Sequence, residues 1–175
     1  MENMLDKKII TIVDEMQDDM VKMRRDCHRY PEPGWTEFRT ASLVAKRLET
    51  LGYNVQTGSD TVNKDYMMGV PDESVLKAAM QRAISQGADA EWVAKMNGGM
   101  TGVIGTMVFS QDGPTVAMRF DMDSNDVWES KEESHRPYKE GFASVNDAAM
   151  HACGHDGHTT VGLSIAAILA KLKDS

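Results

Sequence analysis

The densest group of chemically active side chains lies near the end of the chain, in the segment Met-His-Ala-Cys-Gly-His-Asp-Gly-His at residues 150–158. This segment holds three of the five histidines and one of the two cysteines. A thiolate and imidazoles together favour a transition-metal ion such as Zn²⁺. Cys153 and His155 lie two positions apart, so in an extended segment their side chains would point to the same side and could share one ion. We therefore predict that Cys153 and His155 are metal ligands.

The other polar residues of this segment are expected to surround and orient the ligands: His151, Asp156 and His158. Asp156 is also predicted to cap a helix that begins there. The spacing differs from that of structural zinc fingers, which pair Cys-x(2–4)-Cys with His-x(3–5)-His, so the pattern favours a catalytic metal site. Two alternatives remain open. One is a polar loop of hydrogen-bonded histidines, and the other is a Cys153 nucleophile activated by His151 or His158.

Two carboxylates form a second feature. The largely apolar residues 116–120 lead into Asp121 and Asp123, which alternate with Met122 and would face the same way at the end of a strand. The functional crevice of α/β sheets lies at the carboxyl ends of strands. Asp121 and Asp123 could bind a metal directly or hold a ligating histidine in one orientation. Turn residues solvated at a strand end are the alternative interpretation.

The helices that would position these side chains are predicted from apolar periodicity. Residues 6–27 form a long amphipathic helix with Cys27 on its buried face, and a second helix runs from an N-cap at Thr36 to a stop at Gly52. Residues 72–97 predict two helices separated at Gly87, inserted on one face of the domain. A last helix covers residues 157–173, with an apolar stripe of Val161, Ile165, Ile168 and Leu172.

Short strands are predicted between these helices. They cover residues 53–55, 101–109 and 115–120, the last two joined tightly through residues 111–114. The charged residues 129–140 predict a loop. Helices around a sheet indicate an α/β sandwich.

Composition excludes several classes of partner. The chain has 175 residues, a net charge of −8 and no cluster of Lys and Arg, so nucleic acid and anionic membranes are poor partners. Residues 162–170, the longest apolar stretch, are too short to span a bilayer. The start of the chain lacks the order of a secretory signal, and two distant cysteines do not predict a disulfide. These features favour the cytoplasm.

Several segments, taken in order, resemble the aminoacylase-like metallopeptidase and amidohydrolase family. They are residues 24–32 (Arg-Arg-Asp-Cys-His-Arg-Tyr-Pro-Glu) followed by Glu37 and Thr40, residues 119–123 and residues 150–158. The likeness is to the branch of indole-acetyl-amino-acid, hippurate and aminobenzoyl-glutamate hydrolases. The likeness to aminobenzoyl-glutamate hydrolases lies in three further segments: residues 68–73, residues 72–97 and Ser-His-Arg-Pro-Tyr at residues 134–138. It covers essentially the whole chain.

The resemblance implies the N-terminal part of a dinuclear-metal catalytic domain, a three-layer α/β sandwich with a mixed sheet. Two divalent ions, Zn²⁺ or Mn²⁺, would serve the hydrolysis of an amide in a small N-acyl amino acid of the aminobenzoyl type. By this likeness Cys153 and His155 are ligands, while His28 and Glu32 are structural. Arg136 is a candidate for binding substrate.

The family's catalytic glutamate pair, further ligands and dimerisation domain have no counterpart in these 175 residues. We therefore expect the catalytic base to lie downstream and the isolated chain to be inactive. The alternative is a non-catalytic truncated subunit or partner-binding half-domain. A homo-oligomer or a related second subunit is the expected protein partner.

Overall fold

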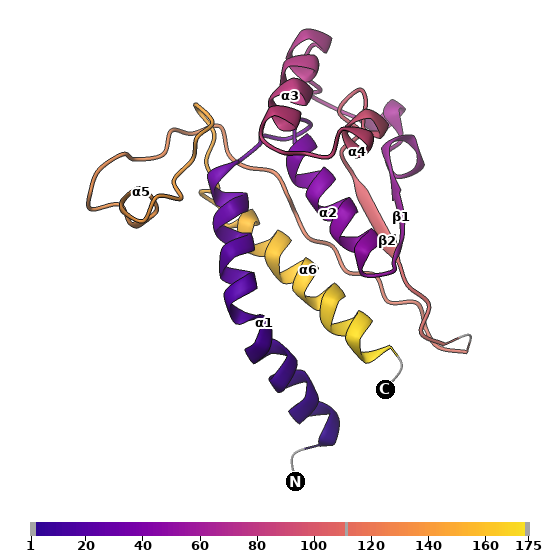
Figure 1. Cartoon of the computed structure of the whole chain (residues 1–175). Coiled ribbons are helices and arrows are strands. Elements are labelled where there is room, and N and C mark those ends of the chain that lie inside the picture. Colours follow the sequence, from indigo (N-terminus) through magenta and orange to yellow (C-terminus); the bar gives the residue numbers. More distant parts are fainter. Residues whose placement is uncertain (1–2, 111, 174–175) are drawn as a thin grey trace.

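The protein is described by a computed structural model that covers residues 3–110 and 112–173. Two layers are visible in Figure 1: a pair of long helices, α1 and α6, and a helix-covered two-stranded sheet formed by β1 and β2. The long connection between β2 and α6 runs beside both layers and carries the short helix α5. The chain is thus a mixed helix and strand structure, as predicted.

Helices α1 (Met4–Arg29) and α6 (His155–Leu172) pack along each other. Ile12 and Met16 of α1 are buried against Ala167 of α6, which forms one apolar cluster. The predicted stripe of α6 is partly wrong. Val161 is exposed and the buried apolar residues are Leu163, Ala166 and Ala167, because α6 is covered on that flank by both α1 and α2.

Helix α2 (Phe38–Thr50) covers one face of the sheet formed by β1 (Asn54–Thr57) and β2 (Val103–Thr106). The two strands are antiparallel, with Asn54 opposite Thr106. A Cβ at Gly105 would lie 2.9 Å from Leu48 Cδ1 of α2, so a larger residue there would have to displace the end of the Leu48 side chain. The predicted N-cap is wrong by one residue: Glu37 occupies it, and the Thr36 hydroxyl instead donates to Pro33 O.

The two helices predicted within residues 72–97 are confirmed as α3 (Glu73–Ser85) and α4 (Ala90–Lys95). They pack on α2 and supply much of the main core, in which Phe38, Leu76 and Met96 are buried. Two 3₁₀ turns, η1 (Gly58–Asp60) and η2 (Lys64–Tyr66), lead from β1 toward α3.

The predicted strand at residues 115–120 is not formed, although the neighbouring strand is present as β2. Within the described residues no segment pairs with 115–120, so Val116 and Met118 remain exposed. A strand needs a partner for its backbone N–H and C=O groups. Gln111, part of the predicted connection, lies outside the described residues. The segment 129–140, predicted as a loop, contains one short helix, α5 (Arg136–Lys139).

In the part of the chain that the structure describes, the sheet has two antiparallel strands. No helix among these residues has both the length and the apolar character needed to cross a bilayer.

Candidate metal centre

Backbone pairing brings the two polar segments of the sequence together. Ser124 N donates to Glu32 O, and Asn125 exchanges two backbone hydrogen bonds with Met150. Asn125 Oδ1 also accepts from Cys153 N at 3.1 Å. Residues 121–123 therefore lie against the start of α6, as the two-carboxylate hypothesis requires, although they do not end a strand.

The segment that enters α6 is bent and not extended. Gly154 is the N-cap of α6 and has φ 98°, a left-handed conformation that favours glycine. His155 is the first residue of the helix. The extended geometry from which we inferred a shared ion for Cys153 and His155 is thus wrong, while their ligand role remains a prediction.

The His155 ring is held in one orientation by Asp123. His155 Nδ1 lies 3.0 Å from Asp123 O and 3.1 Å from Asp123 Oδ1, both of which accept hydrogen bonds. The proton therefore sits on Nδ1, which leaves the Nε2 lone pair available to a metal ion. A carboxylate that orients a ligating histidine in this way is a common feature of metal sites.

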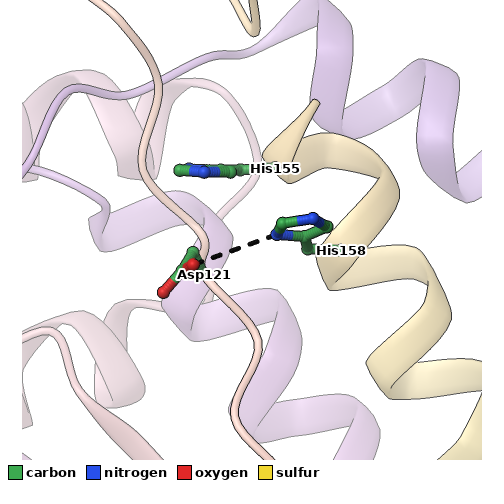
Figure 2. Close-up of side chains that lie close together, drawn as sticks. All are labelled: Asp121, His155 and His158. Carbon is green, nitrogen blue, oxygen red and sulfur yellow. Dashed lines mark ion pairs between the residues drawn. The ribbon is translucent and has the colours of Figure 1, made fainter. Parts of the chain in front are cut away.

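Asp121, His155 and His158 form a group in which one donor atom of each residue lies within 4.8 Å of the others. Figure 2 shows Asp121 facing His158, whose Nδ1 lies 3.9 Å from Asp121 Oδ2. The rings of His155 and His158 stack with centroids 5.1 Å apart because they lie three residues apart on the first turn of α6. Two imidazoles and a carboxylate are suitable ligands for Zn²⁺ or Mn²⁺. The donor set fits a divalent cation.

Cys153 is exposed and carries a free thiol one residue before the helix cap. It does not belong to the group formed by Asp121, His155 and His158. Cys27, the other cysteine, is buried in α1 as expected, and burial raises the pKa of its thiol to about 12. That pKa excludes a thiolate at neutral pH, so Cys27 is a packing residue.

Asp156 does not cap α6 as predicted, because Gly154 takes that position. Asp156 lies in the first turn, where its side chain is buried and accepts from Gly157 N and from His28 Nδ1 at 2.9 Å. Burial alone would raise the pKa of Asp156, but the hydrogen bonds from His28 and Gly157 outweigh burial and lower it. Asp156 is therefore an ionised anchor that ties α6 to α1.

His151 is buried, with 5% of its surface exposed. Neither ring nitrogen has a hydrogen-bond partner among the residues that the structure describes. Burial lowers the pKa of His151 to about 4, so the ring is neutral at neutral pH.

The other proposed site residues lie in structural roles or away from the centre. Glu32 is fully buried and accepts from the backbone N–H groups of Arg39 and Thr40 at the start of α2. Arg136 is exposed on α5, where its guanidinium pairs with Glu140. A groove of about 730 Å³ lies between α1, α2 and residues 87–89, and none of the predicted site residues lines it.

Two residues that form hydrogen bonds with the segments around the centre were missed by the sequence analysis. Glu129 accepts from both His28 and His135, and Asn125 holds the backbone of Cys153. Neither residue lies in a recognisable pattern, since Glu129 is one of several acidic residues in a charged segment. Their roles depend on contacts between distant parts of the chain.

Comparison with known proteins shows which family the last third of the chain is similar to. Residues 117–175, which contain the whole candidate centre, match the profile of Peptidase family M20/M25/M40. The family resemblance predicted from the sequence is thereby confirmed.

Three individual proteins are similar to this chain in sequence or in structure. The chain is 48% identical over 160 residues to indole-3-acetyl-aspartic acid hydrolase of Enterobacter agglomerans, covering 91% of this chain and 37% of that protein. It is 47% identical over 161 residues to one subunit of the p-aminobenzoyl-glutamate hydrolase of Escherichia coli (strain K12), covering 92% of this chain and 37% of that subunit. The crystal structure of the aminobenzoyl-glutamate utilization protein from Klebsiella pneumoniae superposes with a TM-score of 0.72 at 35% identity, covering 97% of this chain and 35% of that one. The chain thus spans little more than one third of the length of these relatives.

Proposed function

We propose that residues 1–175 form the N-terminal part of the catalytic domain of a metal-dependent hydrolase that cleaves amide bonds in N-acyl amino acids. The observation that carries this proposal is the orientation of His155. Its Nδ1 is bonded to Asp123, which leaves the Nε2 lone pair available, and the residue belongs to the group that it forms with Asp121 and His158. The same residues lie in the part of the chain that matches a peptidase family.

A divalent cation, Zn²⁺ or Mn²⁺, would supply Lewis-acid chemistry, polarising the scissile carbonyl and lowering the pKa of the attacking water. The residues of this chain would bind the cation and orient its ligands. We assign His155 and Cys153 as ligands, Asp123 as the residue that orients His155, and Asp121 with His158 as the groups that complete or flank the site. A second divalent ion would need ligands from the remainder of the protein.

A general base is not assigned within this chain. Asp121 pairs with Arg119 at 2.6 Å, Asp123 with His155, and Asp156 with His28. Each carboxylate beside the centre is therefore already paired with a cation or an imidazole, and we assign none of them as the base. We assign the base to the part of the protein that these residues do not include.

In the complete protein, we place these residues in a three-layer α/β sandwich with a mixed sheet, with residues 72–97 as a helical insertion. Val116 and Met118 would then be covered, because a strand at residues 115–120 would gain its partner from the rest of the domain. The E. coli relative is named as one subunit of its hydrolase, which makes a related second subunit or a homo-oligomer a reasonable partner here. We also place the protein in the cytoplasm.

The experiment is complementation. The chain is mixed with a polypeptide that carries the part of the E. coli relative following the matched stretch, and release of p-aminobenzoate from p-aminobenzoyl-glutamate is followed with and without a chelator. We expect no turnover by the chain alone and chelator-sensitive turnover by the mixture, lost in His155→Ala. Turnover by the purified chain alone, or turnover that resists the chelator, would contradict the proposal.

The non-catalytic alternative gives a different result in the same experiment. A partner-binding half-domain would associate with the added polypeptide and restore no chelator-sensitive turnover.

A further inference from the structure

His28, near the end of α1, is a buried ionisable side chain outside the candidate centre, and both of its ring nitrogens face carboxylates. Its Nδ1 lies 2.9 Å from Asp156 Oδ2, and its Nε2 lies 2.8 Å from Glu129 Oε1. The three side chains are buried, with 10%, 1% and 3% of their surface exposed. The imidazole therefore bridges two carboxylates that are far apart in sequence and screened from water.

The geometry determines the charge of His28. An ionised carboxylate oxygen only accepts hydrogen bonds, so each ring nitrogen that faces one must carry a hydrogen. Both ring nitrogens face carboxylates, which makes His28 an imidazolium. Burial alone would lower the pKa of His28, but the hydrogen bonds to Asp156 and Glu129 outweigh burial and raise it.

Each carboxylate connects His28 to a different segment. Asp156 lies in the first turn of α6, one residue after His155, and also pairs with Arg24 of α1 at 3.4 Å. Glu129 begins the loop of residues 129–145, accepts from His135 Nε2 at 2.8 Å and accepts from Ser144 N.

The loop is also held on α1 directly. Glu140 pairs with Arg25, and Val145 N donates to Arg29 O. The rings of Phe142 and His28 are in a T-shaped arrangement with centroids 5.6 Å apart. One imidazolium thus joins three parts of the fold.

We infer that His28 is a positioning residue for the metal centre: held between Glu129 and Asp156, it fixes the first turn of α6 and the 129–145 loop on α1 and so sets the placement of His155 and His158. This inference rests on the proposed function, since it concerns the same centre. The hydrogen bonds of the His28 ring go to Asp156 and Glu129 and not to either histidine of the centre, so it acts through Asp156.

The test compares two histidines that share Glu129. His28→Gln removes the bridge to Asp156, whereas the control His135→Gln removes the other imidazole on Glu129 and leaves the bridge in place. Zn²⁺ affinity is measured by following the ring resonances of His155 and His158 by NMR. We expect His28→Gln to weaken Zn²⁺ binding about tenfold or more, the usual effect of losing a residue that orients a ligand, and His135→Gln to change it less than about twofold. Equal effects of the two variants would overturn the inference.

Two further readouts do not depend on metal. In the unsubstituted chain, both ring nitrogens of His28 should show ¹⁵N shifts of protonated nitrogen at about pH 7, although an ordinary histidine is mostly neutral there. The amides of Gly157 and His158, which donate to Gly154 O, should lose hydrogen-exchange protection about tenfold in His28→Gln and not in His135→Gln. A neutral His28, or unchanged protection, would refute the bridge.

The readouts separate the two proposals. If the chain binds no Zn²⁺ while the ¹⁵N shifts and exchange data agree with expectation, the proposed function fails and the bridge stands. If Zn²⁺ binds at His155 and His28→Gln has no effect, the bridge fails alone. Should His28→Gln not fold, Glu129→Gln provides a milder comparison, because it removes one of the two anions that hold the imidazolium and leaves the bond between His28 and Asp156; it should weaken Zn²⁺ binding more than His135→Gln does.

The pH response is part of the same test. The titratable and charged groups that face His28 or its carboxylate partners are Asp156 and His151 beside the start of α6, Glu129 and His135 in the loop, and Arg24 on α1. The ¹⁵N titration of His28 is therefore read together with those of His135 and His151, so that the three rings are assigned separately.

Discussion

Gly162 on α6 links helix packing to the geometry of the metal centre. A Cβ at this position would lie 2.6 Å from Phe120 Cδ2 and 2.7 Å from Phe120 Cγ. Carbon atoms in contact prefer about 3.5–4.0 Å, so Gly162→Ala must displace the Phe120 ring by roughly 1 Å. Phe120 directly precedes Asp121, so the displacement reaches residues 121–123.

The expected magnitude is the difference between two opposing effects. Overpacking a tight contact costs about 1–3 kcal/mol, and replacing Gly by Ala within a helix contributes about 1 kcal/mol in return. Gly162→Ala should therefore lower the free energy of unfolding by about 0–2 kcal/mol. Gly157→Ala is the matched control on the same helix, because its Cβ would meet only Arg24 Nε at 3.9 Å. That variant should be as stable as the unsubstituted chain, or more stable by up to about 1 kcal/mol.

The assay is urea unfolding followed by circular dichroism, together with NMR spectra of the histidine rings. Gly162→Ala should be less stable than Gly157→Ala and should shift the His155 and His158 resonances through Asp123 and Asp121. If Gly162→Ala equals or exceeds Gly157→Ala in stability and leaves the ring resonances unchanged, the proposed coupling between Phe120 and the centre is wrong.

Three further outcomes follow from the described contacts. Asp123→Asn should weaken Zn²⁺ binding by up to about tenfold, because a neutral amide replaces the carboxylate beside His155 Nδ1–H while the backbone O of residue 123 still accepts from it. Unchanged affinity in a chelator competition assay would argue against a role for the carboxylate. Burial raises the pKa of Glu37 to about 7, so the free energy of unfolding should fall as pH rises from about 4.5 to about 7. Since part of the side chain is exposed, Glu37→Gln should raise the free energy of unfolding above this pH range by only about 1–2 kcal/mol, measured by urea unfolding. A less stable Glu37→Gln variant above about pH 7 would contradict the raised pKa of Glu37. The pKa of His28 is raised, so its stabilisation of the folded state is fully present below about pH 6.5 and is lost as pH rises through its folded pKa. The pKa values of Glu129 and Asp156 are lowered, so their stabilisation is lost only as pH falls below about 4.5 and 3.8. The melting temperature should therefore decline above about pH 6.5, and a decline that persists in His28→Gln would assign it to another group.

Most helices were predictable because the spacing of apolar residues and the glycines and prolines that end helices are local features of the sequence. The run Ile12, Met16, Met20 marks the buried face of α1, and Gly87 and Gly52 end helices where predicted. The stripe of α6 was predicted less well because Leu163 and Ala167 are buried by neighbours that are far apart in sequence. The strand at residues 115–120 has the composition of a strand, but pairing is a tertiary property that composition does not supply.

The sequence predicted which residue types form the candidate centre, but it did not predict the backbone bend or the hydrogen bonds that hold them. The density of histidine, cysteine and aspartate in residues 150–158 marks the segment, and Asp121 and Asp123 do lie against it. The bend at Gly154 was missed because left-handed backbone is not visible in the spacing of Cys153 and His155. Glu129 was missed because its two imidazole partners come from separate segments of the chain.

The central claim is that the start of α6 binds a divalent cation through His155. Its most direct test is a Zn²⁺ titration of the chain, followed through the ring resonances of all five histidines. We predict saturable shifts at His155 and His158, little change at His135, and binding weak enough to be lost on dialysis. Rings of His155 and His158 that do not respond up to millimolar Zn²⁺, or that respond no more than His135, would contradict the claim.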